Sequence, residues 1–73
     1  MQVHTDPYEE LANAIVLAAV KDYRKSLKTL KKNPKSHPAL DMKAECERFF
    51  LSQYFQVLTS VDGERLMKKL QEE

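Results

Sequence analysis

The chain has 73 residues, with 12 Lys or Arg against 11 Asp or Glu, so its net charge is only +1 and selects no class of partner. Seventy-three residues leave room for one small domain, spanning 1–73, and 42% hydrophobic content with a single Gly favours a helical globular domain over a disordered chain or a sheet. Cys46 is the only cysteine, which excludes an internal disulfide and is consistent with a reducing, cytoplasmic setting.

The first predicted helix covers residues 7–32. Asp6 followed by Pro7 is typical of a helix start, because Asp caps free backbone N–H groups and Pro in the first turn loses no hydrogen bond. Pro34 ends the helix, since proline cannot continue it. At 100° per residue, one face is apolar and is expected to pack on the other helices: Tyr8, Ala12, Ile15, Ala19, Tyr23 and Leu30.

The first half of this helix is also apolar on its other faces, at Leu11, Ala14, Leu17 and Ala18. A helix that is apolar all round is expected to be covered all round. Either the shorter helices wrap it, or a second copy of the chain does, and the small alanines would let another helix approach closely. The alternative is a few exposed apolar side chains, which are normal on a protein surface.

The second half of the first helix is basic. Seven of the 12 basic residues lie here and in the turn that follows: Lys21, Arg24, Lys25, Lys28, Lys31, Lys32 and Lys35. This basic ridge either contacts nucleic-acid phosphates, meets an acidic protein partner, or is a solvated face whose lysines favour the C-terminal end of the helix dipole. The ridge has one Arg and no interleaved aromatic residues, which favours the solvated interpretation over base recognition.

A proline-containing loop over 33–37 leads to a second predicted helix, residues 38–51. A loop this short joins antiparallel neighbours, so the second helix is expected to return along the first. Its main apolar face includes Cys46, Phe49 and Phe50. We therefore interpret Cys46 as a small buried hydrophobe, because a catalytic thiol would need a base and an electropositive setting.

Four of the six aromatic residues fall within 49–55, and we expect the core to form around them. Ser52 can cap a short helix over 53–58, which would turn Tyr54, Phe55 and Leu58 inward; alternatively the second helix runs straight through. A last helix is predicted over 61–71, preceded by possible caps that include Asp62. The predicted fold is thus all-α: a small bundle with a long first helix, an antiparallel second helix and two short C-terminal helices.

The run Glu45-Cys46-Glu47-Arg48-Phe49-Phe50-Leu51-Ser52, with the later Asp62-Gly63-Glu64, resembles short uncharacterised proteins encoded in bacterial prophages and integrative elements. The segments Tyr8-Glu9-Glu10-Leu11 and Val20-Lys21-Asp22-Tyr23-Arg24 are similar to the same group. The resemblance implies a mobile-element context and assigns no functional residue.

Several classes of function are disfavoured by what the sequence lacks. It offers no nucleophile–base pair, no glycine-rich phosphate loop and no metal-ligand cluster, so neither an enzyme, a cofactor nor a metal site is expected. The longest apolar run, Leu11–Val20, is ten residues interrupted by Asn13 and is too short to cross a bilayer. The sequence therefore predicts a non-enzymatic interaction module that binds a protein partner or a second copy of itself. The alternative is a nucleic-acid-binding accessory protein that uses the basic ridge.

Overall fold

A computed structural model describes residues 7–73, and every regular element in that range is a helix: α1 (Pro7–Lys32), α2 (His37–Phe50), α3 (Gln53–Leu58) and α4 (Gly63–Gln71). The predicted all-α fold is therefore confirmed. Its long first helix has the predicted bounds, α2 begins and ends one residue early, and α4 begins two residues late. The expected Asp6 cap lies outside the described residues.

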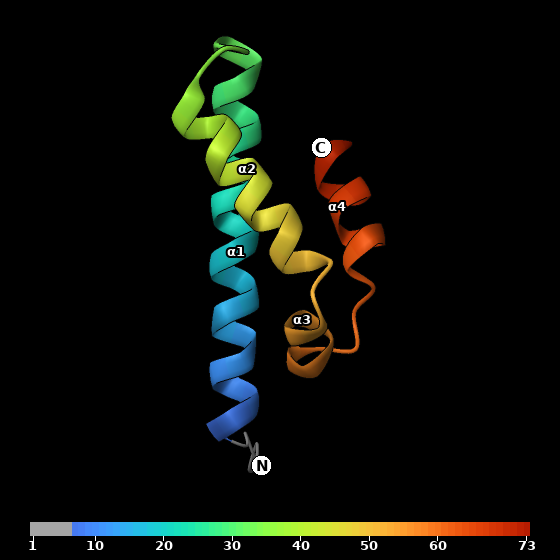
Figure 1. Cartoon of the computed structure of the whole chain (residues 1–73). Coiled ribbons are helices and arrows are strands. Elements are labelled where there is room, and N and C mark those ends of the chain that lie inside the picture. The colour runs from blue at the N-terminus through green and yellow to red at the C-terminus, as the bar shows by residue number, and fades with distance from the viewer. Residues whose placement is uncertain (1–6) are drawn as a thin grey trace.

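Helix α2 returns obliquely along the C-terminal half of α1, and α3 and α4 lie together on one side of this pair (Figure 1). The N-terminal end of α1 extends past the other elements. The body measures 47 × 26 × 20 Å, and its long dimension follows α1.

Local capping explains where the shorter helices begin. The Ser36 side chain accepts a hydrogen bond from the Ala39 N–H at the start of α2, with Pro38 in the first turn where its missing N–H costs nothing. Ser52 accepts from the Phe55 N–H at 3.2 Å and donates to the Phe49 carbonyl at 2.6 Å. The chain thus breaks between α2 and α3 at Ser52, as predicted.

The core forms where α1 meets the three later helices, around the predicted aromatic segment. Phe50 and Phe55 are buried, and their rings meet edge to face with centroids 5.6 Å apart. Tyr23 of α1 packs edge to face on Phe50 at 5.5 Å. Such edge-to-face pairs add to the stabilisation from buried area. The remaining buried members of this core are Val20, Cys46, Met67 and Leu70.

Two tyrosines that were predicted to pack against other helices are exposed instead. Tyr54 remains 55% exposed, because α3 is a short helix whose buried side is already occupied by Phe55. Its ring contacts only the edge of the cluster, at 6.0 Å from Phe49. Tyr8 is 82% exposed because it lies on the first turn of α1, beyond the reach of the shorter helices.

Candidate functional site

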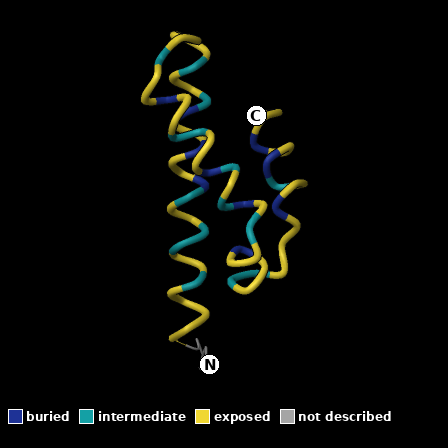
Figure 2. The backbone as a smooth tube through the Cα atoms, viewed as in Figure 1, coloured by how far each residue is buried: buried dark blue, intermediate teal, exposed yellow. Residues whose placement is uncertain are grey.

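The first half of α1 presents an uncovered apolar surface. Leu11, Ala14, Leu17 and Ala18 are all exposed, Leu11 at 61% and Leu17 at 62%; we call these four residues the apolar face. The opposite side of the same helix is half-buried at Ala12, Ile15, Val16 and Ala19, and of these Val16 and Ala19 pack against the core. Figure 2 shows this division: along the N-terminal half of α1, exposed residues (yellow) alternate with half-buried ones (teal). The shorter helices therefore do not wrap α1.

Charged residues flank the apolar face along the same stripe of α1. At 100° per residue, positions 10, 14, 17 and 21 fall within one 60° sector, the spacing typical of a helix–helix seam. Glu10 lies at one end of this stripe and Lys21 at the other, and both are exposed. The stripe is thus acidic at its start, apolar in the middle and basic at its end.

The basic ridge borders an open cleft between α1, α2 and α4. The cleft has a volume of about 780 Å³. Three leucines, Leu27 and Leu30 from α1 and Leu70 from α4, form its apolar part. Its cationic lining comes from both sides of the cleft: Lys21, Arg24, Lys25, Lys28 and Lys31 on α1, and Lys43 on α2. Lys32 and Lys35, which the sequence places in the same ridge, do not line it.

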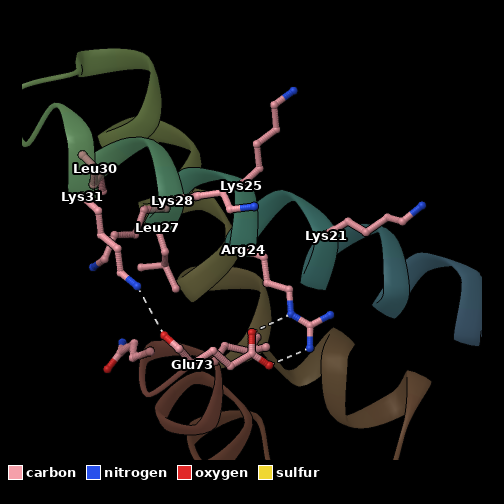
Figure 3. A pocket seen from close by; sticks show the side chains of 11 residues that line it. Lys21, Arg24, Lys25, Leu27, Lys28, Leu30, Lys31 and Glu73 are labelled. Carbon is pink, nitrogen blue, oxygen red and sulfur yellow. Dashed lines mark hydrogen bonds and ion pairs between the residues drawn. The ribbon is translucent and has the colours of Figure 1, made fainter.

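A carboxylate already occupies one side of the cleft. The Arg24 guanidinium donates from Nε and from an Nη to the two carboxylate oxygens of Glu73, at 2.8 and 2.7 Å, and Lys31 Nζ donates to the Glu73 carbonyl at 3.3 Å (Figure 3). Lys21 and Lys25 instead extend away from this pair. The hydrogen bonds from Arg24 hold the pKa of Glu73 below its ordinary value.

Sequence reasoning missed two members of this cleft, Glu73 and Lys43. Glu73 lies 49 residues from Arg24 and Lys43 lies on another helix, so the spacing of α1 alone could not find them. The available signal was the pair of acids that follows α4, since a second reversal of the chain makes α4 run in the same direction as α1 and brings its C-terminal end beside the bases of α1 (Figure 1).

A polar network crosses the middle of the body. The Tyr23 hydroxyl donates to Glu47 at 2.8 Å and accepts from Gln71 at 2.8 Å, and Lys43 donates to the same Glu47 oxygen at 2.8 Å. Burial first, and then the contact with Glu47, raises the pKa of Tyr23. Burial alone would raise the pKa of Glu47, but the hydrogen bonds from Lys43 and Tyr23 lower it overall. The network thus favours a protonated Tyr23 hydroxyl and an ionised Glu47 carboxylate, and its hydrogen bonds join α1, α2 and α4.

Cys46 lies in the core, as predicted, with its Sγ 3.7 Å from the Ala19 carbonyl oxygen. Burial raises the pKa of its thiol, and the neighbouring acids Asp22, Glu45 and Glu47 raise it further. A raised pKa keeps the sulfur in its protonated, weakly nucleophilic form. Within residues 7–73, no group of three His, Cys, Asp or Glu side chains is placed to hold a metal ion.

No helix in the described part of the chain is both long and apolar enough to cross a membrane. Comparison with protein-family models, with curated proteins and with solved structures finds no match.

Proposed function

We propose that this protein is a small, non-enzymatic, cytoplasmic interaction module of mobile-element origin, and that it associates with a second copy of itself through the apolar face. The observation that supports this proposal is the exposure of Leu11 and Leu17, 61% and 62%, on a helix whose opposite side is packed. Ala14 and Ala18 beside them let a partner helix approach closely. The resemblance to mobile-element proteins supports the proposed origin, and the lone buried Cys46 supports the proposed compartment.

Burial of the apolar face supplies the driving force. Full burial of a leucine side chain contributes roughly 1.5–3 kcal/mol, and a symmetric pair would bury Leu17 of both copies near its centre, with Leu11 at its margin. One helix stripe offers less than the roughly 800 Å² per partner that is typical of a stable complex. We therefore expect association with a dissociation constant of roughly micromolar or weaker.

Sedimentation velocity over a concentration series tests the proposal. Wild-type protein is expected to shift from monomer to dimer at roughly tens of micromolar, and Leu17→Lys is expected to remain monomeric, since it places a charge at the centre of the apolar face. Leu40→Lys is the matched control, because Leu40 is also exposed, at 42%, but lies at the opposite end of the body. A wild-type monomer throughout the series would refute self-association.

Nucleic-acid binding by the basic ridge is the second candidate function. It is favoured by the exposure of all seven basic residues and by the outward direction of Lys21 and Lys25 (Figure 3). Contacts to phosphate would make binding fall steeply with salt. A mobility shift at low salt that is lost when Lys25, Lys28 and Lys32 are changed to Glu would support it, and no shift with duplex or single-stranded DNA would exclude it.

A further inference from the structure

The cleft combines two features that suit different parts of one ligand. Six cationic residues line it, of which Lys21 and Lys25 extend away from the Arg24–Glu73 pair and Lys43 is already bonded to Glu47, so Arg24, Lys28 and Lys31 supply its available charge; Glu73 is the one acidic residue in this lining. Beneath these charges, the half-buried Leu27 and Leu30 offer an apolar surface, backed by Leu70, which is buried in the core. A ligand that fills this cleft therefore needs carboxylate or phosphate groups at its edges and an aliphatic group at its centre.

The carboxylate of Glu73 shows which anionic group fits the edge of the cleft beside Arg24. Its carboxylate accepts two parallel hydrogen bonds from Arg24, and this bidentate geometry matches a planar carboxylate to the planar guanidinium. Both side chains remain about half exposed, 54% for Arg24 and 49% for Glu73. An ion pair exposed to this extent is weakly held, because water and salt screen it. A competing carboxylate can therefore displace Glu73.

We infer that the cleft binds an acidic, leucine-bearing peptide segment of a partner protein. One carboxylate of the segment takes the place of Glu73 on Arg24, and a further carboxylate meets Lys28 or Lys31. An aliphatic side chain between them covers the exposed parts of Leu27 and Leu30. A nucleic-acid backbone would satisfy the lysines but leave the leucines uncovered, so charge and apolar surface together favour the peptide. This site lies C-terminal to the apolar face on α1 and shares only Lys21 with the stripe that flanks that face, so the inference does not depend on self-association.

Fluorescence anisotropy with two labelled probes tests the inference. The first probe is a short peptide of alternating glutamate and leucine, and the second is a single-stranded oligonucleotide of equal charge. Glu73→Gln is expected to tighten peptide binding roughly two- to fivefold, because it removes the internal competitor. Arg24→Gln is expected to weaken peptide binding at least about fivefold. Arg24→Lys is expected to weaken it by less, since lysine keeps the positive charge but cannot donate two parallel hydrogen bonds to a carboxylate.

Lys32→Gln is the matched control, because it removes one charge from the same ridge without altering the cleft lining. Circular dichroism establishes that each variant keeps its helices, and Arg24→Lys provides a second variant should Arg24→Gln unfold. Peptide binding that Arg24→Gln weakens and Lys32→Gln leaves nearly unchanged supports the inference. Equal effects of these two substitutions, absence of peptide binding at low salt, or tighter binding of the oligonucleotide would each overturn it.

Discussion

Tyr23 contributes to this fold through both parts of its side chain. Its ring is fully buried against Phe50, while its hydroxyl bridges Glu47 on α2 and Gln71 on α4. Helical spacing predicts the buried ring, because Tyr23 lies on the apolar stripe of α1. The hydrogen-bond partners lie 24 and 48 residues away, and nothing local in the sequence indicates them.

The substitution Tyr23→Phe keeps the ring and removes the bridge. Glu47 would lose one of its donors and Gln71 its acceptor, so we expect a loss of about 1–2 kcal/mol in the free energy of unfolding. Urea denaturation followed by circular dichroism measures this change. Tyr54→Phe is the control, since that ring is half exposed and surface changes usually stay within about 0.5 kcal/mol. Equal midpoints for Tyr23→Phe and wild type would contradict the role of the bridge.

The same bridge predicts how stability depends on pH. The pKa of Glu47 is lowered from its ordinary 4.5, so its contribution is present above that pH and is lost as the pH falls through the lowered value. The pKa of Tyr23 is raised from 10.0, so its contribution is present below that pH and is lost as the pH rises through the raised value. Denaturation at several pH values is therefore expected to show a shallower decline for Tyr23→Phe than for wild type at both extremes.

At the scale of elements, the helix boundaries follow from signals within a few residues. Pro34 ends α1, Ser52 separates α2 from α3, and Asp62 caps α4 by accepting from the N–H groups of Glu64 and Arg65 at 3.0 and 3.3 Å. Such caps are legible in sequence because they satisfy backbone donors only two or three residues away. Helix α4 begins at residue 63, two residues after its expected start near 61, because Asp62 is the residue that caps it.

Gly63 shows how the contact between two elements constrains a residue that the local sequence leaves unexplained. It begins α4, and a Cβ added there would overlap the carbonyl oxygen of Phe50 at the end of α2 and lie 3.3 Å from a ring carbon of Phe55. The backbone angle φ of Gly63 is not positive, so close approach explains the absence of a side chain. This approach of two helix ends is a property of packing, which periodicity does not reveal.

Gly63→Ala is accordingly expected to destabilise the protein by about 1–3 kcal/mol, because backbone atoms of Phe50 must move to admit the methyl group. The better helix propensity of alanine opposes this cost but does not relieve the overlap. Thermal and urea denaturation measure the difference. Ser60→Ala in the same connection is the control, since Ser60 is exposed and we expect little effect. A more stable Gly63→Ala protein would show that α4 does not approach α2 this closely.

At the scale of the whole molecule, the two candidate surfaces differ in how far the sequence reveals them. The apolar face lies on one helix, so its four residues follow from helical spacing, and the structure shows them exposed. The cleft needs α1, α2 and α4 together, and only the fold brings Lys43 and Glu73 beside Arg24. A surface on one element is predictable from periodicity, whereas one shared by three elements depends on their packing.

The charges that flank the apolar face determine how two copies would pair. In a parallel pair, Glu10 faces Glu10 and Lys21 faces Lys21, so like charges meet at both ends. In an antiparallel pair whose two-fold axis passes between positions 15 and 16, residue 10 faces residue 21 and residue 14 faces residue 17. Each Leu17 then packs on an Ala14, and each Glu10 meets a Lys21. Charge and side-chain size therefore both favour the antiparallel arrangement.

Charge exchange tests this arrangement apart from self-association itself. Glu10→Lys and Lys21→Glu are each expected to weaken the dimer about two- to fivefold, since each places like charges opposite one another. The double variant restores opposite charges and is expected to return to the wild-type dissociation constant in sedimentation equilibrium. In a parallel dimer, wild type and all three variants oppose like charges at both ends, so neither single substitution would weaken the dimer and the antiparallel arrangement would be contradicted. Weakening by Leu17→Lys alone, with no response to either charge change, would therefore support a contact through the apolar face but overturn the antiparallel pairing of Glu10 with Lys21.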